Sequence, residues 1–189
     1  MKKILFLGLI ISSLTAKGQT VTELQQQIAI LEQQKIVLQE KVDFCELYNN
    51  SDVSETKTFN SNFEFKVLEC KGNSIEQTVE LTVTIKHSLP NQQLNIWTGR
   101  EKPIAYGETG NSYDFKSVKF PNSRVSMGSE QFDSPTNLLI QGKITFRNIL
   151  PQTEKLSLVN GTIQFKNKDG GGNKAQGTFE IKNLNINWN

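Results

Sequence analysis

The chain has 189 residues and carries 21 Lys and Arg against 19 Asp and Glu. Three of the lysines, Lys2, Lys3 and Lys17, lie in the first 18 residues, which contain no acid, so the rest of the chain has a net charge of 18 − 19 = −1. Because it has neither excess positive charge nor a basic cluster, we expect no nucleic-acid partner. The length suits one domain of ordinary size with a short appendage.

Residues 1–18 have the pattern of a cleavable signal peptide. Two lysines precede an apolar run, Ile4–Ile11, and Ala16 and Gly18 place small residues at positions −3 and −1 of a cut before Gln19. The run is too short to cross a bilayer, which takes ~20 apolar residues. The first cysteine is Cys45, so we expect no lipid anchor next to the leader. The sequence predicts a periplasmic or extracellular protein whose mature chain has no transmembrane segment.

Residues 19–47 are predicted to form an amphipathic, coiled-coil-like helix. The segment contains no Gly or Pro and is rich in Gln, Glu, Leu and Lys, which favour helices. Its a and d positions recur over about three and a half heptads. These positions are Val21, Leu24, Ile28, Leu31, Lys35, Leu38, Val42 and Cys45. The pattern predicts either a homo-oligomer or an envelope protein partner that docks on the helix.

A second apolar stripe, Ile30, Val37 and Phe44, lies outside the a/d seam. A two-stranded coil would leave it exposed, so it favours three or more strands, or packing of the helix on the β domain of its own chain. The cysteines leave a similar choice open. Cys45 and Cys70 can pair with each other after export, pair between chains, or remain free.

Residues 48–61 are polar and lack periodicity, so they are predicted to be a linker. From residue 62 to residue 189 the period becomes two. The clearest example is Val79–Ile85, in which apolar residues alternate with Glu and Thr. About eight such strands at short spacing predict an antiparallel β-sandwich or a barrel, and we expect a sandwich.

Two local features refine this prediction. Asn160-Gly161 lies between Leu156–Val159 and Thr162–Phe165, which is the strongest two-residue signal for a hairpin. After Asn183 the apolar phase shifts by one residue, which predicts a β-bulge in the last strand.

The stretch Ile144–Pro151, with Asn148 and Pro151 forming an Asn-x-x-Pro corner, is followed by the Leu-x-Leu strand Leu156–Leu158. These residues belong to a pattern from Phe120 to Phe165, roughly a quarter of the chain, that resembles exported immunoglobulin-like modules. The resemblance implies a fold and not an activity. The predicted fold is therefore mainly β, an antiparallel β-sandwich of immunoglobulin-like type preceded by one N-terminal coiled-coil-like helix.

Catalytic and metal-binding signals are weak. The only histidine, His87, ends a predicted strand and cannot build a multi-histidine metal site. The carboxylates on strand faces are best explained by solubility, although paired carboxylates also occur in glycosidases; they are Glu64, Glu80 and Glu180. Asp169 lies in a Gly-rich loop without the repeated acids of calcium loops. We therefore expect no metal, no cofactor and no enzyme activity.

One segment favours ligand binding. The predicted connection Trp97–Tyr113 gathers Trp97, Arg100, Tyr106 and Tyr113 among glycines. Aromatic side chains and Arg are enriched at binding hot spots, and flat rings can stack on sugars. The alternative is that Trp97 and one tyrosine fill the core of the sandwich.

Two functions follow from these patterns. The first is an exported, non-enzymatic interaction protein of the cell envelope, with the helix for self-assembly or docking and the β-sandwich as a binding surface. The alternative is a β-sandwich module that binds a glycan or another ligand through the Trp97–Tyr113 segment.

Overall fold

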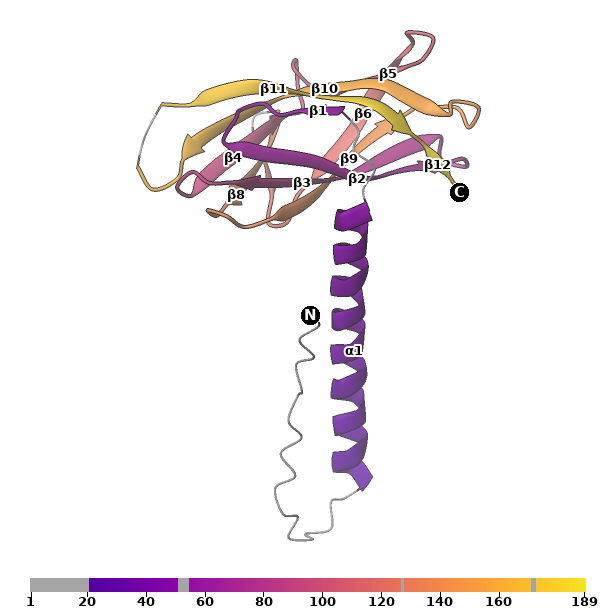
Figure 1. Cartoon of the computed structure of the whole chain (residues 1–189), viewed down its shortest axis with the longest axis vertical. Helices are drawn as coiled ribbons and strands as arrows, with labels where there is room; N and C mark the ends of the chain where they lie inside the picture. Colours follow the sequence, from indigo (N-terminus) through magenta and orange to yellow (C-terminus); the bar gives the residue numbers. More distant parts are fainter. Residues whose placement is uncertain (1–20, 51–54, 127, 171–172) are drawn as a thin grey trace, which may run out of the picture. The chain divides into compact units, whose positions relative to one another are not determined.

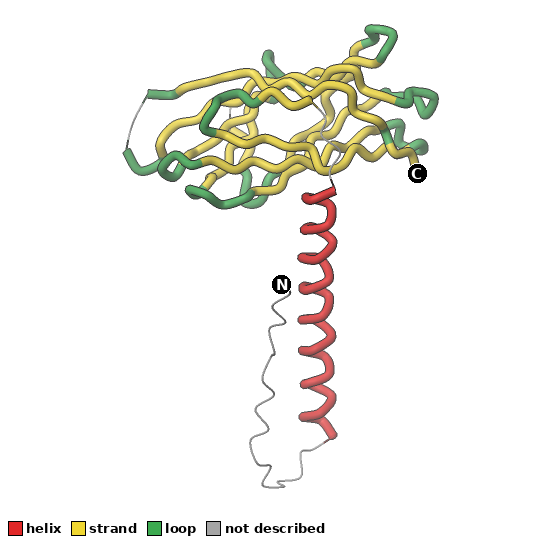
Figure 2. Tube along the Cα trace, in the orientation of Figure 1, coloured by secondary structure: helices red, strands yellow, loops and turns green. Residues whose placement is uncertain are grey.

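The computed structural model describes residues 21–50, 55–126, 128–170 and 173–189. They belong to two compact units whose boundary lies between Glu46 and Leu47. Helix α1 runs from Val21 to Asn50, so the first unit contains most of it, and the second contains its last residues and the β domain (Figures 1 and 2). The predicted signal peptide lies outside the described residues. The mainly β fold with one N-terminal helix is confirmed, whereas the coiled-coil character of the helix stays a prediction.

Within the described ranges the β domain has twelve strands in two layers that β6 connects. The first layer, sheet A, contains β1 (Glu55–Lys57), β11 (Ala175–Asn185), β10 (Lys155–Asn167), β5 (Ile104–Gly107), β4 (Gln92–Trp97), β8 (Ser129–Ser134) and β7 (Arg124–Ser126). The second, sheet B, contains β12 (Asn187–Trp188), β2 (Phe63–Asn73), β3 (Thr78–His87), β9 (Ile140–Arg147) and β6 (Ser112–Lys119). Neighbouring strands are antiparallel, except that β12 runs parallel to β2.

Strand β10 organises sheet A. Along one edge it pairs with β11 over most of its length. Along its other edge it pairs with two strands in succession, β5 beside its first half and β4 beside its second half. Because β4 continues to β8 and β7, the sheet is wide around the middle of β4.

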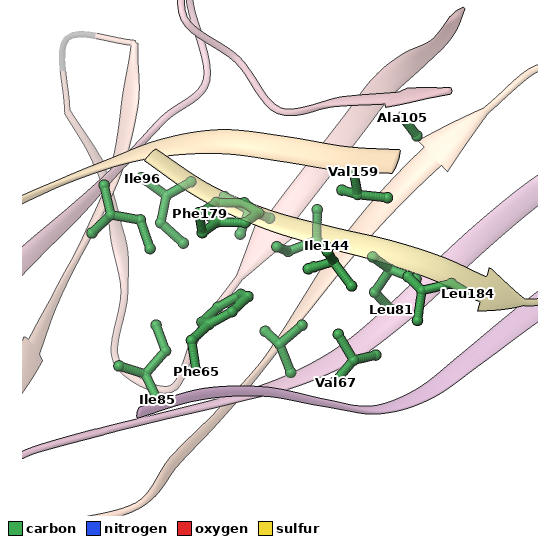
Figure 3. Close-up of a cluster of buried hydrophobic side chains, with 14 of the residues drawn as sticks. Phe65, Val67, Leu81, Ile85, Ile96, Ala105, Ile144, Val159, Phe179 and Leu184 are labelled. Atoms are coloured by element: carbon green, nitrogen blue, oxygen red, sulfur yellow. The ribbon is translucent and has the colours of Figure 1, made fainter. Parts of the chain in front are cut away.

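The core lies between the two sheets and consists of the alternate residues that the period of two predicts. Phe65 of β2 points toward Phe179 of β11, with ring centroids 4.9 Å apart (Figure 3). Leu81 and Ile85 of β3, and Ile96 of β4, are also completely buried. The outer faces carry polar side chains, as antiparallel sheets with a solvated face require.

The Asn160-Gly161 hairpin prediction is wrong. Both residues lie in the middle of β10, where they pair with Glu180 and Phe179 of β11. A two-residue turn of this type needs positive φ at both positions, and neither residue has it. Gly161 is instead required by space, because a Cβ on it would lie 2.7 Å from two ring carbons of Phe179.

The predicted linker at 48–61 also differs from the structure. The helix continues to Asn50, and β1 pairs with β11 through Thr56 and its neighbours. Phe59 is buried in the core, with its ring centroid 4.5 Å from that of Phe63. The polar composition around it conceals this single apolar anchor, so the β domain begins earlier than residue 62.

Two phase shifts adjust which side chains face the core. The predicted change of phase in β11 is present, because burial changes from Ile181 to Leu184 across Asn183, which has φ +59°. The predicted β-bulge is wrong, since β10 and β11 keep the same register on both sides of Asn183. A second shift, between Val67 and Glu69 of β2, is not apparent in the sequence pattern.

Candidate functional site

The a and d side chains of α1 are exposed. The apolar members of the series have exposed fractions between 45% and 71%, and they are Val21, Leu24, Ile28, Leu31, Leu38 and Val42. Lys35 and Cys45 in the same series are exposed as well. Of the second stripe, Ile30 and Val37 are exposed, and the side chain of Phe44 lies outside the described residues. The apolar residues of the a/d series therefore leave a large apolar surface exposed on α1.

Trp97 is the last residue of β4 and lies on the outer face of sheet A. Leu94 and Ile96 of the same strand point into the core, so alternation directs Trp97 outward. Its side chain is half-buried, and its indole Nε1 is shielded from solvent without a hydrogen-bond partner among the described residues. It lines a pocket of about 430 Å³ with Gly99, Arg100, Glu101 and Gly128.

The predicted ligand-binding residues are not all in one place. Trp97 and Arg100 share the pocket, whereas Tyr106 and Tyr113 do not line it. The reason is that β5 and the start of β6 lie inside the predicted connection. Tyr113 packs against the core, and its hydroxyl lies 3.2 Å from Thr153 Oγ1.

A row of four amide side chains and one arginine crosses the outer face of sheet A beside Trp97. Asn95 of β4 is opposite Gln131 of β8 on one side and opposite Gln164 of β10 on the other. Gln164 is in turn opposite Gln176 of β11, and Gln131 is opposite Arg124 of β7. We call these five residues the amide row.

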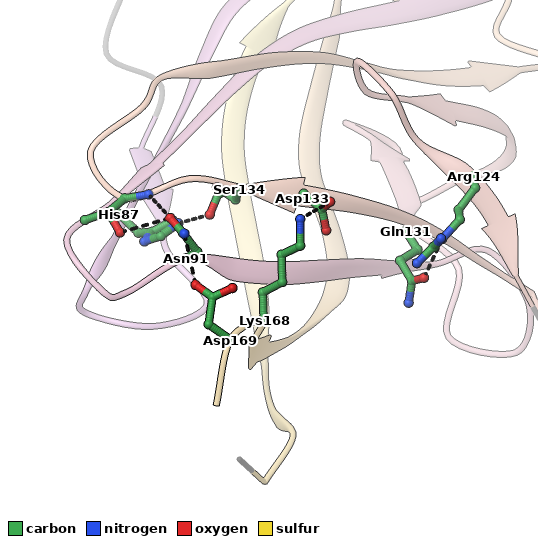
Figure 4. Close-up of polar contacts among 9 residues, drawn as sticks. His87, Asn91, Arg124, Gln131, Asp133, Ser134, Lys168 and Asp169 are labelled. Carbon is green, nitrogen blue, oxygen red and sulfur yellow. Dashed lines mark hydrogen bonds and ion pairs between the residues drawn. The ribbon is translucent and has the colours of Figure 1, made fainter. Parts of the chain in front are cut away.

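The members of the amide row interact at both ends. Arg124 Nε donates a hydrogen bond of 2.8 Å to Gln131 Oε1 (Figure 4), and Gln164 Nε2 donates one of 3.5 Å to Gln176 Oε1. In the middle, Asn95 is only 7% exposed, and its Oδ1 has no hydrogen-bond partner among the described residues. The central position of the row therefore holds an unsatisfied acceptor.

The amide row was not predicted from the sequence, although the residues of β4 carry a signal for it. In β4, Gln93, Asn95 and Trp97 alternate with apolar residues, which marks them as one strand face. The sequence does not reveal that β8, β10 and β11 bring Gln131, Gln164 and Gln176 to the same height. That alignment depends on pairings between distant segments.

The remaining polar candidates have structural partners. His87 is buried at the end of β3, and its Nδ1 and Nε2 lie 3.1 and 2.9 Å from the carbonyl oxygens of Leu89 and Ser134. The three strand carboxylates form ion pairs with lysines, as Glu80 does with Lys143 at 2.6 Å. Asp169 accepts a hydrogen bond of 3.0 Å from Asn91 Nδ2 (Figure 4). No group of three or more potential metal ligands occurs among the described residues.

The two cysteines occupy different environments. Cys45 is exposed on α1, and Cys70 is buried in β2. Both thiols are free in the structure. Burial, followed by the negative charge of Glu69, raises the pKa of the Cys70 thiol to about 12. Whether either cysteine forms a disulfide after export stays a prediction.

No protein-family model matches the sequence, and no curated protein matches it. Among solved structures, the chain is similar to self-complemented MyfA, the major subunit of Myf fimbriae from Yersinia enterocolitica, with 10% identity, a TM-score of 0.40 and coverage of 66% of this chain and 97% of that one. It is also similar to the PapD-like domain 7 of human CEP192, with 10% identity, a TM-score of 0.37 and coverage of 73% and 97%.

A third similar structure comes from the aggregative adherence fimbriae of enteroaggregative Escherichia coli, with 12% identity, a TM-score of 0.33 and coverage of 67% and 100%. A fourth is the enzyme AvmM, which catalyses a macrocyclization, with 9% identity, a TM-score of 0.25 and coverage of 69% and 95%. At this level the similarity concerns the arrangement of strands and not function.

Among the described residues, no helix combines the length and the apolar character needed to cross a membrane.

Proposed function

We propose that this chain is an exported, non-enzymatic interaction protein of the cell envelope. In this proposal α1 joins copies of the chain into an oligomer, and each copy presents its β-sandwich as a binding surface. The observation that carries the proposal is the exposed a/d series of α1, because burying it against a second copy removes apolar surface from water.

A second copy of the chain is the occupant we favour for this face. The 30-residue helix is long enough for about four heptads, and its apolar residues keep the seven-residue spacing that two identical helices can match. Lys35 at an a position weakens the seam but restricts its register. The second stripe, represented by Ile30 and Val37, favours three or more helices over two.

The test is the mass of the purified protein by light scattering over a dilution series. We expect an oligomer for the unmodified chain and a monomer for Leu31→Asp, because this change places a charge at the centre of the seam. The matched control is Gln33→Asp, which adds the same charge on the opposite face of the same turn and should leave the oligomer intact.

A monomeric unmodified chain would overturn the assembly proposal. An oligomer that survives Leu31→Asp would also overturn the assembly proposal. Either outcome would favour packing of α1 on the β domain of its own chain.

Export is part of the proposal. The motivation is the leader pattern and the small residues Ala16 and Gly18 before Gln19. The N-terminal mass of the protein recovered from the envelope should correspond to a chain that begins at or near Gln19. Retention of Lys2 and Lys3 would contradict the assignment.

A second candidate function is ligand binding by the sandwich, most simply of a carbohydrate. The observation that favours it is the indole N–H of Trp97, which is shielded from solvent at a pocket that also contains Arg100 and has no partner among the residues that the structure describes. An aromatic ring beside hydrogen-bonding groups suits a sugar, which has both apolar and hydroxyl faces. Of the predicted residues, this candidate retains Trp97 and Arg100.

A further inference from the structure

Two polar atoms on the same face of β4 have no hydrogen-bond partner within the described part of the chain. Asn95 Oδ1 is a hydrogen-bond acceptor, and Trp97 Nε1 is a donor. The two residues are separated by one position, so both side chains project from the outer face of sheet A. Buried polar groups in proteins are usually paired, and each exception calls for an explanation.

The surroundings of these two atoms extend the polar surface. Gln131 and Gln164 flank Asn95 in register, and Arg124 and Gln176 continue the row to β7 and β11. Five adjacent strands span about 19 Å at the usual strand spacing. The row is therefore long enough for more than one sugar unit.

We propose that the amide row together with Trp97 binds an oligosaccharide through its hydroxyl groups. A hydroxyl can donate to Asn95 Oδ1, and a second hydroxyl of the same ligand can accept from Trp97 Nε1. Each flanking glutamine also offers a donor and an acceptor on one planar group. The inference rests on the second candidate function and gives it a surface and a ligand class.

Other ligand classes fit this surface less well. The row crosses the middle of the sheet, where backbone groups are already paired, so a peptide strand cannot add to it. The adjacent charges Asp133 and Lys168 pair with each other at 2.7 Å (Figure 4), and Arg124 is bonded to Gln131. A face that is rich in amides matches the uncharged hydroxyls of sugars.

The long side chains of Gln131 and Gln164 can rotate, which gives a hydroxyl a way to reach Asn95 Oδ1. Asn95 Oδ1 would then gain a hydrogen-bond partner. Because a buried acceptor without a partner is unfavourable in the free protein, gaining that partner favours the complex. The Trp97 ring would contact the apolar face of the same or the next sugar.

The experiment begins with the purified full-length protein on an array of neutral hexose and N-acetylhexosamine oligosaccharides. The strongest binder is then titrated by calorimetry. We expect Gln164→Ala to weaken binding about tenfold through lost hydrogen bonds. Trp97→Phe, which keeps a ring but removes the N–H, should weaken it by a similar factor.

The matched control is Gln141→Ala, which removes an exposed amide from the outer face of sheet B and should leave the affinity unchanged. Failure of every array glycan to bind would overturn the inference. So would equal loss of affinity in Gln141→Ala and Gln164→Ala. Light scattering on the same samples reports self-association independently of glycan binding. A monomer that binds the glycan would refute the assembly proposal and leave this inference intact.

Discussion

Gly161 shows how packing can require glycine inside a strand. The ring of Phe179 and Pro103 Cγ occupy the space beside its Cα, at 2.7 and 3.2 Å from the position of a Cβ. We expect Gly161→Ala to lower the free energy of unfolding by about 1–3 kcal/mol, because an added methyl group overpacks the site. Urea denaturation measures this change.

The neighbouring substitution Asn160→Ala is the control for Gly161. In a two-residue turn Asn160 would supply a favoured positive φ, and its replacement would be costly. In the middle of β10 it should change the free energy of unfolding by less than about 0.5 kcal/mol. Adding Phe179→Leu to Gly161→Ala should restore part of the lost stability. Equal costs for the two single variants would contradict the continuous strand.

Cys70 makes a pH-dependent contribution to stability. Its side chain is 4% exposed, and its pKa rises from 9.0 to about 12 because burial disfavours the thiolate. Between these values the unfolded chain releases a proton that the folded chain retains, so stability falls as pH rises. The contribution is complete below pH 9 and is lost from pH 9 toward pH 12 at about 1.4 kcal/mol per pH unit.

The Cys70→Ala variant should lack this part of the pH dependence in urea denaturation above pH 9. The same burial predicts that thiol reagents modify Cys45 in the folded protein and Cys70 only after unfolding. Rapid labelling of Cys70 in Cys45→Ser would disagree with the core position of Cys70. An accessible Cys70 would also favour the predicted disulfide between the two cysteines.

At the scale of elements, the segment from β1 to Phe59 fastens the start of the β domain. Phe59 is 7% exposed and contacts Phe63 and Phe165, at ring-centroid distances of 4.5 and 5.9 Å. We expect Phe59→Ala to lower the free energy of unfolding by about 3 kcal/mol, as cavities left by large aromatic side chains do. The control Ile75→Ala removes a side chain that is 93% exposed and should have little effect. A comparable cost for both variants would count against the buried position of Phe59.

The elements that the sequence predicts well are those with a long, unbroken period. β3 has four alternating apolar residues, and helix α1 has seven apolar positions at heptad spacing, so each could be recognised locally. β1 has only three residues, and the one buried residue near it is Phe59. A segment this short has no periodic pattern to detect. For β10, the local preference of Asn-Gly for a turn is overridden by pairing with β11, β5 and β4.

The candidate site also combines residues whose position can be predicted locally with residues whose position depends on distant strand pairing. The outward direction of Trp97 and Asn95 can be inferred from β4 alone. The position of Gln164 opposite Asn95 cannot, because the two residues are far apart in the chain and meet only through the β4–β10 register. Tyr113 was predicted to lie in a connection, but it belongs to β6, and the four-residue β5 before it is too short to give a recognisable pattern.

For the whole molecule, the division at Leu47 predicts that the β domain folds without α1. A fragment of residues 47–189 should be soluble and give a β-type circular dichroism spectrum and a cooperative thermal transition. A fragment of residues 60–189 lacks β1 and Phe59 and should melt at a lower temperature. Aggregation of the longer fragment would mean that α1 contributes to the core.

The central place of β10 also determines when this domain can be completed during synthesis. β4 and β5 precede Lys155 by many residues, yet the edge that each presents to β10 has no partner until β10 has been made. Sheet A therefore stays incomplete on a growing chain until β10 has been synthesised, even if β2 and β3 of sheet B pair early. Unpaired strand edges invite association with other chains. Completion of sheet A therefore depends on the residues from Lys155 onward.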